Sequence, residues 1–170
     1  MPVLIPPWKK QSEWRELHKT LAALISSREK GLADARTAAR NIRMHLVDVA
    51  LPMENLCLET CRFCPGVCCR AATVWADFKD ALFWHLAGQN IPPAQNLSRA
   101  GQTCRYLGAK GCTLPRLSRP FMCTWYICPT QVSRLRNLPQ SASCTKLKMT
   151  LQTIKDLRTE MENAFICAVL

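Results

Sequence analysis

Apolar residues recur at steps of three and four along the first third of the chain, which is the spacing of one face of an α-helix. Two such runs occur, and their apolar positions are Trp14, Leu17, Leu21, Leu24 and Ile25, followed by Leu32, Ala35, Ala39, Ile42, Leu46 and Val49. Ser12 is placed to cap the first helix, Gly31 to end or kink it, and Pro52 to end the second. The pattern predicts a helical N-terminal part over residues 12–50.

The same spacing predicts two helices in the rest of the chain. One spans about residues 74–87, with Thr73 as its N-cap and Gly88 beyond its end. The other spans about residues 145–168 and is expected to pack along the N-terminal helices. Its apolar positions are Leu147, Leu151, Ile154, Leu157, Met161, Ala164, Phe165 and Ala168. Residues 89–142 hold six of the 11 prolines and no long periodic segment, so they predict mostly loop.

Length and composition favour one folded domain. A chain of 170 residues, 48% of them hydrophobic, can bury a core without covalent cross-links. Neither an internal repeat nor a low-complexity tract is visible. We therefore expect a mainly α protein, a single domain over residues 1–170, in which helices carry irregular cysteine-rich metal-binding loops over residues 57–128.

Nine of the 11 cysteines fall in two short segments of these expected loops. They are Cys57, Cys61, Cys64, Cys68, Cys69, Cys104, Cys112, Cys123 and Cys128. Spacings of two or three residues allow one turn of chain to aim two sulfurs at the same ion. Gly108 and Gly111 would permit a tight turn that returns Cys112 towards the preceding cysteine. The side chains of adjacent Cys68 and Cys69 diverge, so one is expected to ligate while the other packs, ligates a second centre or reacts chemically.

Disulfide bonds are the main alternative for so many cysteines. Their odd number argues against complete pairing. The N-terminus does not resemble a secretory signal, and no apolar run approaches the roughly 18 residues of a membrane-spanning helix. We therefore expect a soluble cytoplasmic protein with no membrane partner, whose thiols stay reduced and available to metal. Cys144 and Cys167, on or beside the last helix, are expected to be ordinary buried thiols.

The residue types in the two segments limit the choice of metal. Neither segment contains a histidine, so all-sulfur coordination is expected, which suits zinc, cuprous copper or an iron-sulfur cluster. Proline directly follows Cys64 and Cys128, as it follows the last cysteine of bacterial ferredoxin motifs, and this favours an iron-sulfur cluster of the 4Fe-4S type over zinc. His85 is expected to be a packed or surface residue rather than a ligand. Glu59 and Asp77 are expected to lie on the solvated surface rather than to act in catalysis.

Several elements of the two segments appear in a characteristic order. These are the closely spaced cysteines that end in Cys68-Cys69, then Cys104-x2-Leu107, Gly111-Cys112, Arg119-Pro120 and Cys123. In this order they resemble the YkgJ-like family, described as zinc- or iron-chelating CxxCxxCC proteins. The resemblance covers residues 57–128, somewhat under half of the chain. It implies metal chelation without an assigned reaction, with some relatives joined to or acting as iron-sulfur-dependent lysine methylases.

Carried over residue by residue, the family's ligands correspond to Cys61, Cys64, Cys68, Cys69, Cys104, Cys112 and Cys123. The family has two residues before the double cysteine, whereas Pro65, Gly66 and Val67 make three here. This departure leaves the separate roles of Cys68 and Cys69 open. Cys57 and Cys128 lie near enough in sequence to join the set.

The net positive charge is concentrated in the second half of the chain, because most carboxylates lie in the first half. There are 23 Lys and Arg against 12 Asp and Glu, and no carboxylate occurs between Asp80 and Asp156. The basic region 99–148 is expected either to balance an anionic metal site or to hold an anionic partner or substrate, nucleic acid included.

Three functions are compatible with these patterns. The first is a metal-binding protein that holds an iron-sulfur cluster or zinc through cysteine thiolates, in a structural or redox role. The second is an iron-sulfur enzyme with an open iron site, methylase-like or sulfur-handling. The third is an RNA- or protein-interaction module that zinc stabilises. No glycine-rich nucleotide-binding motif is present.

Overall fold

The computed structural model describes residues 6–61, 64, 68–97, 99, 101–109, 111–136 and 141–170. Its helices are α1 (Gln11–Ser27), α2 (Ala33–Thr60), α3 (Cys68–Ala71), α4 (Phe78–Leu86), α5 (Met122–Trp125), α6 (Pro129–Arg136) and α7 (Ser141–Val169), with 3-10 turns η1 (Glu29–Gly31) and η3 (Arg116–Ser118). Strands β1 (Leu107–Gly108) and β2 (Gly111–Cys112) pair as an antiparallel hairpin, with Leu107 opposite Cys112. The expected mainly α architecture is confirmed.

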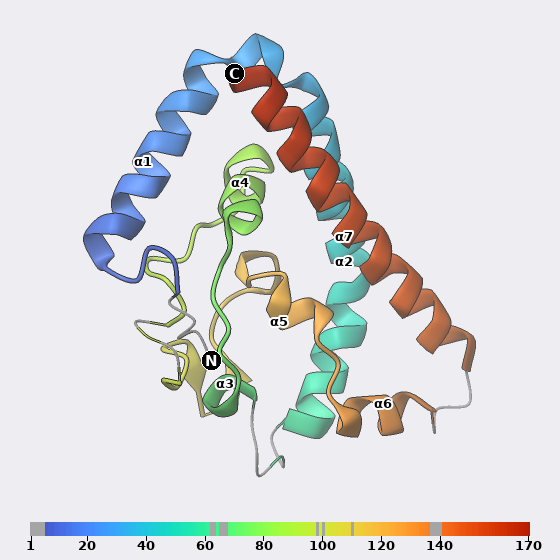
Figure 1. Ribbon diagram of the computed structural model, residues 1–170. Coiled ribbons are helices and arrows are strands. Elements are labelled where there is room, and N and C mark those ends of the chain that lie inside the picture. The colour runs from blue at the N-terminus through green and yellow to red at the C-terminus, as the bar shows by residue number, and fades with distance from the viewer. Residues whose placement is uncertain are drawn as a thin grey trace, which may run out of the picture.

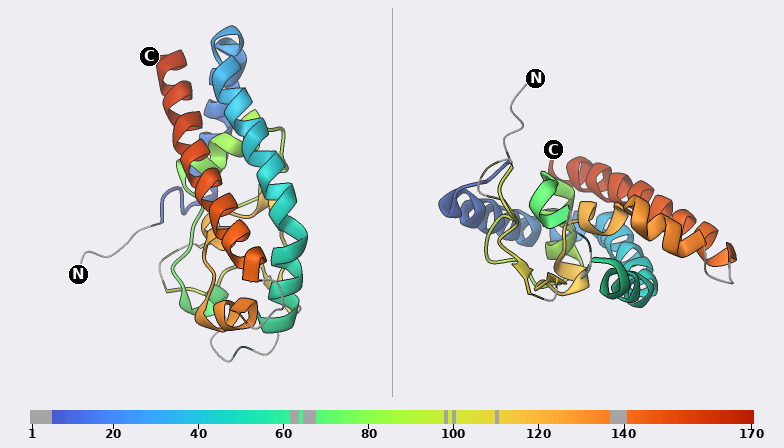
Figure 2. Two further views of the ribbon diagram at one scale, coloured as in Figure 1. Left: turned by 90° about the vertical axis from the view of Figure 1, so that its right-hand side faces the viewer. Right: turned by 90° about the horizontal axis from the view of Figure 1, so that it is seen from below.

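The long helices α2 and α7 run antiparallel and side by side, and they form the frame of the molecule (Figure 1 and Figure 2). Helix α1 diverges from α2 at η1, and α4 lies between α1 and the α2–α7 pair (Figure 1). Helices α3, α5 and α6 lie in the half of the molecule where α2 ends. The last helix therefore packs along α2, as its apolar spacing predicts.

One hydrophobic core joins these helices. Its most completely buried side chains include Trp14, Ile42, Leu82, Trp84, Ile154 and Met161. Burial of an aliphatic or aromatic side chain of this size contributes roughly 1.5–3 kcal/mol. The apolar stripes read from the sequence thus face the core on α1, α2 and α7.

Two helix boundaries near the N-terminus test the predicted caps. Helix α1 begins at Gln11, so the prediction that Ser12 caps it is wrong. The backbone N–H of Lys10 instead donates to the Glu13 carboxylate, 3.2 Å away, and this contact closes the first turn. Of the two outcomes expected at Gly31, an end or a kink, the structure shows a break, because α1 ends at Ser27, η1 ends at Gly31 and α2 begins at Ala33.

The prediction that Pro52 ends the second helix is wrong. Helix α2 continues through Pro52 to Thr60. Met53 and Leu56 continue the buried stripe of Leu46 and Val49, so their packing offsets the roughly 3 kcal/mol that an internal proline costs. As a result, Cys57 lies on the last turns of a long helix instead of on a loop.

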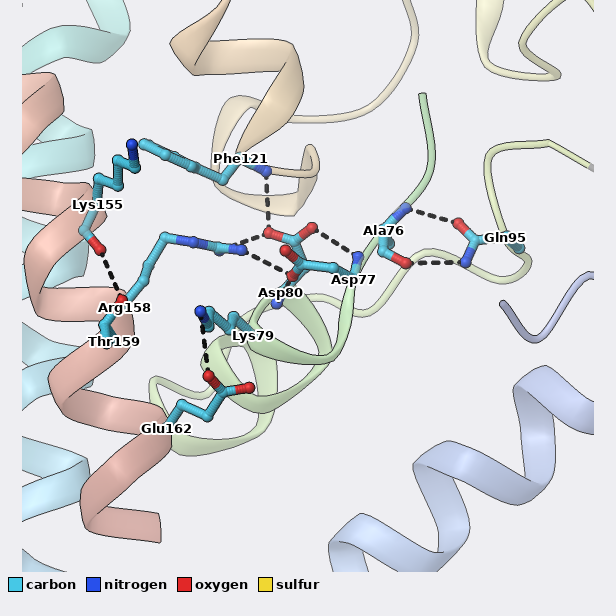
Figure 3. Close-up of polar contacts among 10 residues, drawn as sticks. All are labelled: Ala76, Asp77, Lys79, Asp80, Gln95, Phe121, Lys155, Arg158, Thr159 and Glu162. Carbon is cyan, nitrogen blue, oxygen red and sulfur yellow. Dashed lines mark hydrogen bonds and ion pairs between the residues drawn. The ribbon is translucent and has the colours of Figure 1, made fainter. Parts of the chain in front are cut away.

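Helix α4 begins later than predicted, and Thr73 is not its N-cap. Asp77 caps it, because the Asp77 side chain accepts from the Asp80 N–H at 2.8 Å and the Asp80 side chain accepts from the Asp77 N–H at 3.0 Å. Residues 74–77 are extended instead, and Gln95 hydrogen-bonds both the N–H and the C=O of Ala76 at 2.8 and 3.0 Å (Figure 3). Gly88 follows the helix with a φ of 60°, in keeping with the predicted end.

The segment predicted as loop contains more regular structure than its prolines indicate. Helix α6 starts at Pro129, a position where the missing proline N–H costs nothing.

Cys144 is partly buried against the core, but Cys167 is exposed, so the expectation of a buried Cys167 is wrong. Among the described residues, no helix combines the length and the hydrophobicity that crossing a membrane requires.

A buried carboxylate ties three elements together. Asp80 of α4 is 3% exposed and accepts from Arg158 of α7 at 2.6 Å and from the Phe121 N–H at 2.9 Å (Figure 3). The Arg158 guanidinium also donates to Asp77 at 2.7 Å and lies 4.8 Å from the centre of the Phe121 ring. These contacts position the chain directly before Cys123.

Two histidines share a hydrogen bond between α1 and α4. His18 Nδ1 lies 3.0 Å from His85 Nε2, and the rings of Trp14 and His18 are 4.5 Å apart in an edge-on arrangement. Burial, with His85 adding to it, lowers the pKa of His18 from 6.5 to about 4. Burial also lowers the pKa of His85. Both rings are therefore neutral in the folded protein near pH 7.

We expect Asp80→Asn to destabilise the protein strongly. The substitution keeps the shape of the side chain but leaves the buried Arg158 charge without its closest anion, and such a loss costs roughly 3–5 kcal/mol. Urea denaturation followed by circular dichroism measures the free energy of unfolding. Asp156→Asn, at an exposed position of α7, is the control and should change it by less than about 0.5 kcal/mol. Equal effects of the two substitutions would contradict the role of Asp80.

We also expect the melting temperature to fall as the pH drops from about 6.5 to about 4. In this range the unfolded chain binds protons at His18 that the folded chain does not, so the histidine contribution is complete above pH 6.5 and is lost towards pH 4. His18→Phe keeps an aromatic ring beside Trp14 and should flatten the decline. His45→Gln, the control, should leave its slope unchanged, and an unchanged slope for His18→Phe would refute the assignment.

Candidate metal centre

The nine cysteines of the two predicted segments come together around one cavity. Its volume is about 340 Å³, and its lining includes Cys57, Cys61, Cys64, Cys68, Cys69, Cys104, Cys112, Cys123 and Cys128. The end of α2, helix α3, strand β2 and helix α5 each contribute to this group. Residues far apart in sequence are thus placed at one site, in the lower half of Figure 1.

Gln131 on α6 links three of the cysteines. Its side-chain N–H group donates to Cys57 Sγ at 3.6 Å and to Cys61 Sγ at 3.8 Å. Its side-chain oxygen accepts from the Cys128 N–H at 3.2 Å. The Gln131 side chain is 4% exposed, so these contacts are shielded from water. One buried amide therefore holds the two sulfurs and the Cys128 backbone close together.

Arg116 brings a buried positive charge beside Cys57. It is 7% exposed and donates from Nη2 to Cys57 Sγ at 3.7 Å. Glu54 accepts from Arg119 at 2.9 Å and lies 3.6 Å from Arg116 Nε. Among the described residues, Arg116 Nε and Nη1 have no hydrogen-bond partner. A buried guanidinium with unused N–H groups is costly unless an anion lies near it.

These surroundings set the pKa values of the neighbouring thiols. A hydrogen bond from Cys61, together with Arg116 and Arg119, lowers the pKa of Cys57 from 9.0 to about 6, although burial opposes this change. The pKa of Cys61 is raised, first by its hydrogen bond to Cys57 and then by burial. Cys57 is therefore the thiolate of the pair, and the proton stays on Cys61.

A second group of cysteines surrounds the hairpin. The Cys104 N–H donates to the Cys69 C=O at 2.8 Å, and the Leu107 N–H donates to the Cys104 C=O at 3.1 Å. Gly111 has a φ of 106°, which permits the predicted turn and brings Cys112 back opposite Leu107. The turn predicted from Gly108 and Gly111, which returns Cys112 towards Cys104, is confirmed. The Asn96 side chain donates to Cys104 Sγ at 3.8 Å.

The thiols of this second group are electrostatic neighbours of one another. Burial, followed by Cys104 and Cys112, raises the pKa of Cys69 to about 11. Burial raises the pKa of Cys123, and the next largest influences are Cys112, Cys69 and Cys104. Cys104 has its pKa raised by burial and, less strongly, by Cys112. These four thiols therefore lie close enough to influence one another's ionisation.

Cys68 and Cys69 are adjacent on α3 but are influenced mainly by different thiols. Burial raises the pKa of Cys68, and the thiols that add to this effect are Cys128, Cys64 and Cys57. Cys68 is itself one of the thiols that raise the pKa of Cys69, so the two adjacent thiols also act on each other. The expected difference in role between Cys68 and Cys69 stays a prediction. Pro65, Gly66 and Val67, which alter the spacing before it, lie outside the described residues.

The cysteines are near one another but are not gathered into a ready-made ion site. In the described parts of the chain, no three Cys, His, Asp or Glu side chains form a group that could hold a metal ion as they stand. Binding would require the sulfurs to move inward, with the loss of protons from the thiols.

The basic residues of region 99–148 divide into two kinds. Arg116 and Arg119 are largely buried and interact with Cys57 or Glu54, so they balance charge inside the protein. Arg99, Lys146 and Lys148 are exposed, and Lys110 lies outside the described residues.

The carboxylates Glu59 and Asp77 each pair with an arginine. Glu59 is half-exposed and pairs with Arg134 at 2.7 Å, and Asp77 is 52% exposed and pairs with Arg158. Both carboxylates lie at the surface, as expected, but each is paired with an arginine.

Sequence reasoning missed Gln131, Arg116 and Asn96 as partners of the sulfurs. The position of Arg116 between Cys112 and Cys123, in a segment without carboxylates, was the available signal. No comparable signal exists for Gln131, because its role depends on helix α6.

A comparison of the chain with models of protein families, with curated proteins and with solved structures finds no match. The resemblance to the YkgJ-like family therefore stays a prediction based on the cysteine spacing.

In the reduced, metal-free protein, we expect Cys57 to be the fastest of the cavity thiols to react with iodoacetamide near neutral pH. A pKa of about 6 leaves it mainly as the reactive thiolate. Arg116→Met removes a donor and a positive charge, so it should slow this reaction severalfold. Mass spectrometry of peptides after timed alkylation gives the rates, with exposed Cys167 as the internal control. Alkylation of Cys57 no faster than that of Cys69 would contradict the assignment.

Proposed function

We propose that this protein binds metal through cysteine thiolates, as an iron-sulfur cluster of the 4Fe-4S type, with zinc as the alternative occupant. The observation that carries the proposal is the convergence of nine cysteines on one cavity, into which buried N–H donors point at the sulfurs. All-sulfur sites of this kind suit iron-sulfur clusters and zinc.

The donors around the sulfurs fit an anionic metal group. Thiolate-bound clusters and four-thiolate zinc sites both carry net negative charge. Arg116 and Gln131 supply buried N–H groups beside Cys57, and two nitrogens of Arg116 have no hydrogen-bond partner among the described residues. Such outer contacts orient the ligands and tune the metal. A bound iron-sulfur cluster would supply one-electron transfer.

The surroundings of the cavity also support an enzyme as a second candidate. Apart from the cysteines, its wall includes apolar side chains such as Met53, Leu58, Val74 and Met122. A cavity of about 340 Å³ leaves space for a small ligand beside a cluster with an open iron. A polyanion-binding module has less support, because Arg116 and Arg119 face inward.

The direct test is to purify the protein without oxygen and to measure iron, acid-labile sulfide and zinc per chain. We expect a brown protein that absorbs near ~400 nm. Stoichiometric zinc in a colourless sample would identify zinc, and not an iron-sulfur cluster, as the bound metal. A metal-free protein that binds neither metal after anaerobic reconstitution would refute the proposal.

A variant with serine at Cys57, Cys61, Cys104 and Cys112 should lose its bound metal, because it removes ligands from both segments. Its control carries serine at Cys144 and Cys167, which lie outside the cavity lining, and should retain the wild-type content. Circular dichroism checks that both variants remain helical. Equal metal content in the two variants would contradict thiolate binding at this cavity.

A further inference from the structure

We propose that the nine cysteines form two separate metal centres and that the division falls between Cys68 and Cys69. The first centre draws on Cys57, Cys61, Cys64, Cys68 and Cys128. The second is formed by Cys69, Cys104, Cys112 and Cys123. This inference rests on the proposed function and extends it by assigning each thiol to a site.

The second centre contains four thiols, the number that completes a tetrahedral zinc site or the protein ligands of a 4Fe-4S cluster. Backbone contacts hold three of the four in one local unit. The Cys104 N–H binds the Cys69 C=O, and the hairpin returns Cys112 to the same region. Cys123 joins them from α5, which follows the anchor of Phe121 on Asp80.

The first centre is assembled around a different set of side chains. Gln131 contacts the sulfurs of Cys57 and Cys61 and the backbone of Cys128, and Arg116 contacts Cys57. None of these side-chain contacts involves a cysteine of the second group. In the second group, the Asn96 side chain donates to Cys104. Among the described residues, the side-chain hydrogen bonds to the sulfurs of the two groups thus come from different residues.

The geometry of α3 explains why the division falls within the double cysteine. Consecutive side chains on an α-helix point about 100° apart. The C=O of Cys68 accepts from the Ala72 N–H at 2.7 Å, which closes the turn that carries both cysteines. The C=O of Cys69 accepts from the Cys104 N–H at 2.8 Å, so Cys69 adjoins the segment that leads into the hairpin, and the Cys68 side chain points about 100° away from that of Cys69.

The unequal size of the two groups gives a sharp test. The first group has one thiol more than a four-sulfur centre needs, whereas the second has none to spare. Cys68→Ser should therefore leave both centres intact, and Cys69→Ser should disable the second. The two substitutions are chemically identical, adjacent in sequence and on the same short helix, so each controls for the other.

The experiment is a titration of the reduced, full-length apoprotein with Co²⁺ under nitrogen, against a weak competing chelator. Thiolate-to-cobalt absorption reports the bound ion. We expect saturation at about two equivalents for the wild type and for Cys68→Ser, and at about one for Cys69→Ser. Cys144→Ser should match the wild type, and circular dichroism of each variant checks its helix content.

Saturation of the wild type at one equivalent, or equal loss in Cys68→Ser and Cys69→Ser, would overturn the two-centre inference while leaving metal binding in place. Failure of the wild type to bind any Co²⁺, with failure of iron and zinc reconstitution, would overturn the proposed function itself. If Cys69→Ser does not fold, Cys112→Ser on the hairpin is the substitute and should give the same drop to about one equivalent.

Discussion

The arrangement of the candidate site depends on a single buried carboxylate. Asp80 accepts from Arg158 on α7 and from the backbone of Phe121, so it connects the helical frame to the second cysteine segment. A buried charge is tolerated only when it is paired and hydrogen-bonded, and these partners satisfy that condition. Helix α7 in turn packs along α2, whose last turns carry Cys57. The two cysteine segments are therefore positioned relative to each other by packing and one ion pair.

Much of the helical frame could be predicted from the sequence, because apolar spacing is a local signal of a buried face. The errors occurred where a distant contact outweighed a local preference. Pro52 is a helix breaker by itself, but the buried Met53 and Leu56 keep α2 helical beyond it. Thr73 can cap a helix, but Gln95 holds the backbone of Ala76 extended and Asp77 takes the capping position.

The candidate site shows the same limit. Cysteine spacing identified the residues that the fold brings together, and it indicated that Cys68 and Cys69 diverge. It could not indicate which thiols each would meet, since that depends on how α3 sits between α2 and the hairpin. The roles of Gln131 and Arg116 could not be predicted from the sequence either, because a glutamine or arginine becomes a partner of sulfur only through long-range packing.

The continuation of α2 through Pro52 has a consequence for how the proposed metal group would assemble. Helix α2 has 28 residues and is about 42 Å long. Its core contacts hold Cys57 in place before any ion arrives. The hairpin and the short helices have fewer such constraints. Under the proposed function, assembly would begin from the Cys57 sulfur on the helix, and the shorter segments would move towards it.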